Sequence, residues 1–257
     1  MAANKNYLKI ALKYLIEIVI IIIGILGAFA LDSWGNQNKR LQTEREIIRQ
    51  IFIELDDNLS DLENDYAVHR VAMNSHIRIT QFLDGREINR DSLSADFYWA
   101  TKDEYIFPNT SGYENLKSIG VDIIQNDTLR NLVSLIYSNN FPRLTKGKTL
   151  FPDIRNFLSP YYEQHFQLNR DTTPYQIAFQ DGDTSNFPLS ITPNLTLYAR
   201  YQPKNWPALR QDERFRFLLA NVLEFRLYKL AMYRRAVNNV KRALDMMERD
   251  YPEALLD

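Results

Sequence analysis

Glu17 is the first residue of this chain whose position could support chemistry. It precedes a run of uncharged apolar residues, and an acid inside a membrane is a candidate for ion passage or for assembly. Lys13 lies four residues earlier, one helical turn away, and both side chains are long enough to reach lipid headgroups. We therefore interpret Glu17 first as an interfacial anchor or ion pair and second as an assembly or ion-passing residue.

Acids and histidines at helical spacing form the next candidate set. Four acids on one helical face could attract a divalent cation, but a solvated face, or one paired with the basic C-terminal segment, is the simpler interpretation. His69 and His76 lie seven residues apart without a third metal ligand in view, which favours polar residues in a packed seam. The four acids are Glu54, Asp57, Asp61 and Asp65.

Catalytic and cofactor signatures are absent from the sequence. Residues 181–185 imitate the start of a calcium loop, but Asn186 stands where that loop needs Gly and Thr192 where it needs Glu. With no cysteine, thiol nucleophiles and thiolate metal sites are excluded. The net charge of −1 argues against general nucleic-acid binding. We expect no enzymatic activity, no catalytic residue, no metal and no cofactor.

The longest uncharged apolar run, residues 18–31, indicates a membrane segment. Its 14 residues span about 21 Å as a helix, which is short of the roughly 30 Å hydrocarbon core. Extending the segment from Tyr14 to Trp34 gives 21 residues with an aromatic residue at each interface. The alternative is a secretory signal, because residues 28–30 read Ala-Phe-Ala and a peptidase could cut before Leu31.

Retention of the segment is favoured by Glu17, since an acid at that position is unusual in a signal peptide, and by helical periodicity that continues past residue 31. Gly24 and Ala28 form a small-x-x-x-small pair, with Gly27 beside it, which favours close approach of a second helix. The segment therefore predicts a lipid bilayer as partner, and self-association or a membrane-protein partner.

Residues 17–28 carry a family resemblance. They read Glu-Ile-Val-x-x-x-Ile-Gly-Ile-Leu-x-Ala and are followed by Trp34. This pattern resembles the G-E-I-V-L-V-V-I-G-I-L-I-A-L anchor of an uncharacterised family of bacterial single-pass membrane proteins. Ile16 stands where that family has Gly, and Asp32-Ser33 where it has Asn-Asn. Residues 113–130 are loosely similar to its central segment. The resemblance implies a membrane-anchored helical protein and brings no activity.

The basic residues on the two sides of the segment are nearly balanced, since Lys39, Arg40, Arg45 and Arg49 follow it. The orientation is therefore predicted from the arrangement of a signal-anchor, a short basic head before a large domain. Three lysines precede the segment, and a domain of about 220 residues follows a short basic head. We expect a bacterial inner-membrane protein with a cytoplasmic N-terminus and a periplasmic main domain. The three lysines are Lys5, Lys9 and Lys13.

Apolar and aromatic residues continue beyond residue 36 at steps of four and three, a period of 3.5. Run backwards, the pattern stays in register with the apolar run, so a single long helix is expected through about residue 80, ending at Asp84-Gly85. The seam holds Ile48, Phe52, Leu55, Leu59, Leu62, Tyr66, His69 and Met73.

The middle of the chain predicts shorter helices. Ser111 and Glu114 read as a capping box for a helix that stops at Gly120, and Asn126 or Asp127 caps a second helix that ends near residues 139–142. Residues 150–168 read as a third helix with a kink at its central proline. The stretch 169–207 holds five prolines and reads as a loop, with extended pieces at 175–180 and 195–201.

A second long helix is predicted over residues 209–250, with Arg226 in its apolar seam. Residues 41–69 hold eight acids and two bases, whereas residues 200–250 hold twelve bases and six acids, so the two segments should pair. We expect a mainly α fold in which the transmembrane helix (residues 1–35 with its basic head) continues into a soluble domain (36–257). There the long helix of about 36–80 pairs antiparallel with 209–250, and a helical insert of about 90–168 packs at the membrane-distal end.

The function predicted from these elements is a single-pass, membrane-anchored helical module that is structural or interaction-based, non-enzymatic and self-associating. Its candidate membrane and assembly residues are Glu17, Gly24, Gly27, Ala28 and Trp34. Exposed aromatics of the insert, Tyr98, Trp99 and Tyr105, would contact a partner. One alternative is a subunit of an oligomeric transport or channel complex that uses Glu17, and another is an exported helical protein cleaved after Ala30.

Overall fold

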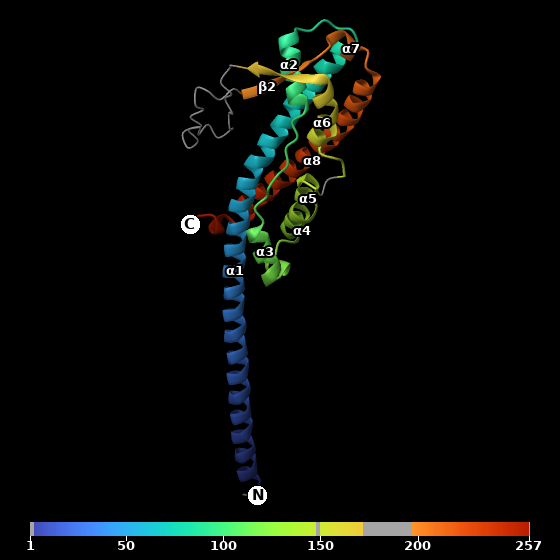
Figure 1. The fold of residues 1–257 in the computed structure, drawn as a ribbon. Helices are drawn as coiled ribbons and strands as arrows, with labels where there is room; N and C mark the ends of the chain where they lie inside the picture. The colour runs from blue at the N-terminus through green and yellow to red at the C-terminus, as the bar shows by residue number, and fades with distance from the viewer. Residues whose placement is uncertain (1–2, 148–149, 172–196, 257) are drawn as a thin grey trace.

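One helix runs through the length of the molecule. The computed structural model describes residues 3–147, 150–171 and 197–256, and helix α1, Ala3–Leu83, accounts for 81 of them. Its N-terminal half stands alone, whereas its C-terminal half packs into the domain (Figure 1). No proline lies within the helix. The expected continuity between the apolar segment and the soluble domain is therefore confirmed.

Helix α1 ends where the sequence predicts. Gly85 adopts φ +97°, a conformation that residues with a side chain rarely take. Its amide N–H donates to the carbonyl of Phe82, and that of Arg86 donates to the carbonyl of Gln81. These two bonds form a Schellman motif, which satisfies carbonyl groups that the end of a helix leaves free.

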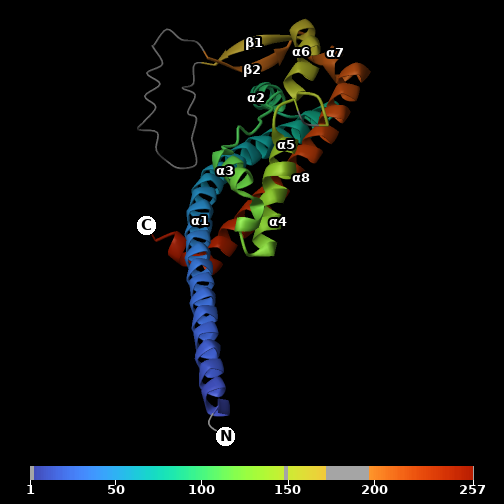
Figure 2. The same ribbon diagram turned by 90° about the horizontal axis from the view of Figure 1, so that it is seen from below.

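Helix α8, Glu213–Asp250, returns alongside α1. It begins four residues later than expected because α7, Trp206–Arg210, is a separate helix, and the Asp212 side chain accepts from the Phe215 amide to cap α8. The C-terminus comes back beside the middle of α1 in both ribbon views (Figures 1 and 2). The predicted fold class, mainly α with two long helices packed together, is confirmed.

The insert between the long helices consists of short elements. The predicted cap at Asn126 is confirmed, since its side chain accepts from the Thr128 and Leu129 amides. The bounds are α2 Arg90–Ala100, α3 Ser111–Ile119, η1 Val121–Ile123, α4 Asp127–Leu135, the π-turn η2 Ile136–Asn140, α5 Phe141–Leu144, α6 Ile154–His165 and η4 Pro252–Ala254.

Three details of the insert correct the sequence analysis. Ser111 is the first helical residue of α3 and not its cap. The second helix does not end at residues 139–142, because η2 and α5 carry it on to Leu144. Finally, α3 and α4 do not lie at the far end of the domain: α3 packs beside α1 and α4 beside α8, near the point where α1 leaves the domain (Figure 1).

Two strands replace part of the expected helix and loop. Helix α6 ends at His165, and β1, Phe166–Asp171, pairs antiparallel with β2, Leu197–Pro203. The extended piece predicted at 195–201 thus corresponds to β2, whereas residues 175–180 and the calcium-like loop at 181–185 lie outside the described residues. Phe166 stacks on Tyr162 and pins the start of β1 to α6.

The core consists of two apolar clusters along the α1–α8 pair. The proximal cluster joins the middle of α1 to the C-terminal half of α8 through α3, α4 and α5. The distal cluster joins the end of α1 to the N-terminal half of α8 through α2, α6 and α7. On α1 the proximal cluster ends at Leu62 and the distal cluster begins at Ile79. Between them, α1 buries the polar residues His69, Ser75 and His76 beside the small residue Ala72.

Candidate functional site

A polar layer separates the two apolar clusters. Its side chains come from α1, from α8 and from the connector between α2 and α3, so three elements meet there. The sequence analysis placed His69, His76 and Arg226 in the helical seams and Asp65 on a face that could pair with the C-terminal helix, but it gave no role to Asp103 or Lys229. The members of the polar layer are Asp65, His69, His76, Asp103, Arg226, Lys229 and Tyr233.

Arg226 is the centre of this layer. Its guanidinium is fully buried and donates through Nη1 to Nδ1 of His69 at 3.0 Å. Through Nη2 it donates to the carbonyls of Ala100 and Lys102 at 3.0 and 2.9 Å. Because a guanidinium only donates, Nδ1 of His69 must accept, which leaves the proton on Nε2 facing the carbonyl of Glu104 at 3.2 Å. Arg226 therefore ties α8 to α1 and to the end of α2.

Lys229 and Asp103 form the buried ion pair of the layer. The two side chains are 2 % and 0 % exposed. The Asp103 carboxylate also accepts from the Tyr105 hydroxyl at 2.8 Å and from the Ile154 amide at the start of α6 at 2.7 Å. The Lys229 ammonium lies 3.8 Å from the centroid of the Tyr105 ring. One carboxylate thus holds the connector, α6 and α8 together.

Burial dominates the ionisation of this layer. It lowers the pKa of His69 to about 3, helped by the charges of Arg226 and Lys229. Burial, with a further contribution from Arg226, lowers the pKa of His76 to about 4. Burial raises the pKa of Asp65 to about 6, against the lowering effect of the hydrogen bond from Tyr233. Both histidines are therefore neutral at pH 7. The charged groups at the centre of the polar layer are then Arg226, Lys229 and Asp103.

The predicted pairing of oppositely charged helices occurs, but hydrogen bonds contribute as much as ion pairs. Lys241 on α8 lies 2.6 Å from Glu63 on α1, and Asp65 accepts from the Tyr233 hydroxyl at 2.9 Å. Glu54 does not face α8 in this way. It is buried and accepts from the Ser111 hydroxyl, from the Gly112 amide and from the Tyr137 hydroxyl.

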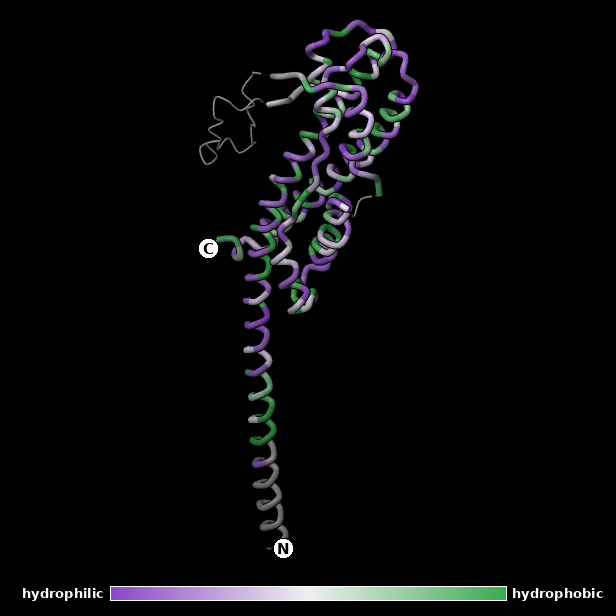
Figure 3. Tube along the Cα trace, in the orientation of Figure 1, coloured by the Kyte–Doolittle hydropathy of each residue, from purple (hydrophilic) through white to green (hydrophobic). Residues whose placement is uncertain are grey.

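The apolar segment on the N-terminal half of α1 lies outside the core. Among the described residues, α1 is the helix long and apolar enough to cross a membrane, and no residue of the apolar window is buried. The large side chains between Ile20 and Leu31 are 50–71 % exposed. Figure 3 shows this stretch as an apolar band beyond the domain. Exposing eight such side chains to water costs on the order of 10 kcal/mol, so an apolar environment is expected around them.

The candidate membrane and assembly residues all lie on this part of α1. Glu17 and Trp34 are exposed, with Gly24, Gly27 and Ala28 on the exposed helix between them. A Cβ added at Gly24 or Gly27 would meet no atom within 4 Å. Within one chain the small residues therefore serve no packing in the described structure, and space is open on that side of the helix for another one.

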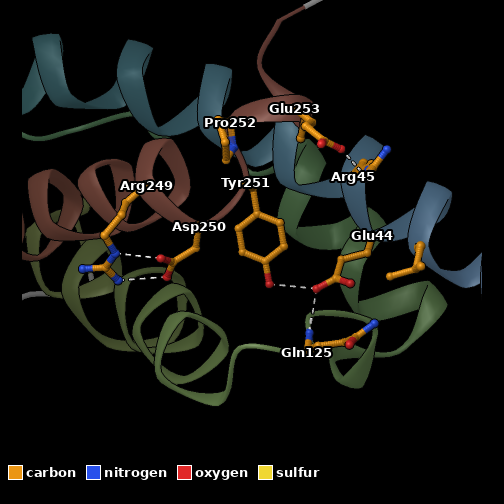
Figure 4. A pocket seen from close by; sticks show the side chains of 10 residues that line it. Glu44, Arg45, Gln125, Arg249, Asp250, Tyr251, Pro252 and Glu253 are labelled. Atoms are coloured by element: carbon orange, nitrogen blue, oxygen red, sulfur yellow. Dashed lines mark hydrogen bonds and ion pairs between the residues drawn. The ribbon is translucent and has the colours of Figure 1, made fainter.

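An open cleft of about 560 Å³ lies where α1 leaves the domain, between residues 41–45 of α1 and the C-terminal residues 249–254. Figure 4 shows Glu44 at its floor, accepting from the Tyr251 hydroxyl at 2.8 Å and from the Gln125 amide at 2.7 Å. At the rim, Arg45 pairs with Glu253. These contacts fasten the C-terminal segment to α1.

The aromatic contact surface expected on the insert is in part wrong. Tyr105 is buried, because its hydroxyl bonds to Asp103 and its ring covers Lys229. Tyr98 packs against Tyr201 of β2 and against its neighbour Trp99, and both are half-buried. None of the three is a freely exposed aromatic residue.

Taken together, these features define a mainly α protein with one exposed apolar helix that could span a membrane, joined without a break to a helical domain. In the part of the chain that the structure describes, no group of three or more His, Asp or Glu side chains is placed to hold a metal ion. Comparisons with family models, curated proteins and solved structures find no match. The resemblance of residues 17–28 to a bacterial anchor stays a prediction.

Proposed function

We propose that this chain is a single-pass membrane protein whose helix α1 holds a non-enzymatic, helical interaction domain at a fixed height above the bilayer. The observation that carries the proposal is the continuity of α1, which passes from an exposed apolar segment into the domain core as one helix of 81 residues. A helix has little freedom to bend, so the domain cannot swing as it would on a flexible linker.

The domain supports a positional role because its interior fixes one arrangement of helices. Sliding α8 along α1 would separate Lys229 from Asp103 and break the hydrogen bonds of Arg226. It would leave buried charges without partners, which is strongly unfavourable. We propose that this rigidity serves to present a surface to another membrane protein or to further copies of the chain, with the small residues Gly24, Gly27 and Ala28 at the contact between membrane helices. The N-terminus would lie in the bacterial cytoplasm and the domain in the periplasm.

The test is membrane retention after alkaline extraction of cells that express the full chain. Replacing both Ile22 and Leu26 with Arg places two charges near the centre of the segment, each of which costs about 2.5–3.5 kcal/mol in a transmembrane helix. We expect the double variant to leave the membrane pellet. Arg at Ile53 and Ile77, two exposed apolar residues of α1 within the domain, provides the matched control and should stay in the pellet.

Other outcomes would identify the alternatives. If the unsubstituted chain itself leaves the pellet and begins at Leu31, it is an exported helical protein. If it stays and conducts ions through Glu17, it belongs to a transport or channel complex. Retention without conduction supports the proposed anchor.

A further inference from the structure

The end of the domain from which α1 emerges is bordered by two segments from distant parts of the chain. One is the turn between α3 and α4, residues 119–126, and the other is the C-terminal segment, residues 249–256. We call these two segments the collar. In Figure 1 both lie near the point where α1 leaves the domain, and the α3–α4 turn reaches closer to the N-terminal end of α1 than the C-terminal segment does.

Hydrogen bonds fix the height of the collar on α1. The chain descends along α1 from residue 109 to residue 122 and then turns back: Asn109 bonds to Asn58, Asn115 to Gln50, Asp122 to Arg40 and Gln125 to Glu44. Arg40 is thus the lowest residue of α1 in this series. The Arg40 side chain donates both to the carbonyl of Asp122, at 2.7 Å, and to its carboxylate, at 3.0 Å.

Apolar side chains are exposed on the collar, although the domain has a core that could have taken them. Ile119 is 46 % exposed, Val121 38 % and Leu256 81 %. Leu41 of α1, between them, is 37 % exposed. Val121 adjoins Asp122, which binds Arg40, so the α3–α4 turn lies at the end of the domain nearest the membrane segment. Leu256 follows Glu253, which pairs with Arg45 five residues further along α1.

The length of α1 places the α3–α4 turn at the lipid headgroups. Arg40 lies six residues beyond Trp34, which corresponds to a rise of about 9 Å along the helix. The headgroup region extends roughly 5–7 Å beyond the hydrocarbon core, and transmembrane helices tilt by about 20° on average. A side chain that projects from the α3–α4 turn toward the membrane can therefore enter the headgroup region without a conformational change in the domain.

The charges of the collar decide what kind of surface it fits. The arginines of the collar and of the residues that adjoin it are paired with carboxylates, so this end of the domain carries little net charge that would attract anionic lipid or an acidic protein. With attraction to a charged surface excluded, the interaction that fits this end of the domain is insertion of its apolar side chains among zwitterionic lipid headgroups. The pairs are Arg40 with Asp122, Arg45 with Glu253, Arg130 with Asp127 and Arg249 with Asp250.

We propose that the collar docks the domain onto the bilayer surface through the α3–α4 turn, with Ile119 and Val121 inserted among zwitterionic phospholipid headgroups. This inference rests on the proposed membrane anchor. It assigns the collar a second, peripheral contact with the same membrane, which would fix the tilt of the domain as well as its height.

The absence of cysteine from the chain makes the test direct. Single cysteines at Ile119, Val121, Phe29 and Phe217 are spin-labelled in the full chain, reconstituted in phosphatidylcholine vesicles. Collision with oxygen, which is enriched in lipid, is compared with collision with a water-soluble nickel complex. Phe29 reports the anchor, and Phe217, exposed at the distal end of α8, is the matched control in water.

We expect the ratio of oxygen to nickel collisions at residues 119 and 121 to be shifted from that at 217 toward that at 29, and to change little when phosphatidylserine is added. Equal ratios at 119, 121 and 217, with 29 in lipid, would overturn the docking and leave the anchor intact. A label at 29 that is open to water would instead overturn the anchor. Spin–spin broadening at 121 would show a second copy on the collar and would also overturn the docking.

Discussion

The ammonium group of Lys229 on α8 contacts the carboxylate of Asp103 on the α2–α3 connector, and neither side chain reaches solvent. This contact joins two residues that are 126 positions apart in the chain. Burying two charges costs free energy, which is recovered only if the charges stay paired and also form further hydrogen bonds. Asp103 has those bonds from Tyr105 and Ile154.

Removing one partner of this pair should destabilise the domain strongly. Replacing Lys229 with Met leaves the Asp103 carboxylate buried without its counter-charge, and we expect a loss of about 3–5 kcal/mol in the free energy of unfolding. Urea denaturation of the full chain in detergent, followed by circular dichroism, measures it.

The matched control is Lys241→Met. Lys241 pairs with Glu63 at 2.6 Å, but its side chain is half exposed, so the loss should be about 1 kcal/mol or less. Equal losses in the two variants would show that burial does not set the value of the Lys229 pair.

The polar layer should make the domain sensitive to acid. His69 and His76 have pKa values of about 3 and 4 in the folded chain and about 6.5 when unfolded. Their contribution to stability is complete above pH 6.5 and is lost as the pH falls through and below that value, by about 2 kcal/mol each at pH 5. Asp65, whose pKa rises to about 6 on folding, changes in the opposite direction and offsets about 1 kcal/mol.

Replacing His76 with Gln should flatten this dependence. Nδ1 of His76 has no hydrogen-bond partner among the described residues, so an amide of similar length should fit at a small cost. The slope of unfolding free energy against pH between 5 and 6.5 is the measurement. The control is His165→Gln, because His165 lies outside the polar layer, where its ring stacks on that of Tyr161. An unchanged slope in the His76 variant would contradict the assignment.

Bulk at Gly24 should reduce the number of copies in a self-associated complex. A Cβ there meets nothing within 4 Å in the single chain, so Leu at this position should leave the fold intact while holding a neighbouring helix away. Native mass spectrometry from detergent counts the copies. Leu26→Phe, which adds volume on the opposite face of the helix, is the control, and loss of copies only in that variant would place the contact on the other face.

Neutralising Glu17 should leave both membrane retention and copy number unchanged, because an interfacial side chain contributes little to either. We expect no proton or cation flux above background from liposomes that contain the unsubstituted chain. A flux that Glu17→Gln abolishes while assembly persists would favour the channel alternative.

The long helix α1 was predictable because its apolar residues recur at a regular spacing in the sequence. The 3.5-residue period places Ile48, Leu55 and Leu62 on one face of α1, and all three are fully buried. A proline-free stretch that stops at Gly85 predicts one uninterrupted helix, and Gly85 takes the left-handed conformation that ends it. Periodicity and turn chemistry are local, so they are visible in one sequence.

Contacts between distant single residues were not predictable in the same way. Asp103 and Tyr105 lie in a connector without periodicity, and nothing nearby in the sequence marks them as buried. A signal did exist on α8: Lys229 follows Arg226 by three residues, so two bases point inward from one face, which requires buried acceptors opposite. Similarly, the Ser111 hydroxyl does not cap α3, and it donates to the carboxylate of Glu54, 57 residues earlier in the chain.

The mass of the chain recovered from alkali-washed membranes tests the central claim most directly, because it reports whether residues 1–30 remain attached. A retained anchor predicts a membrane-bound chain that includes those residues. A chain that begins at Leu31 and is found in the soluble fraction would contradict it.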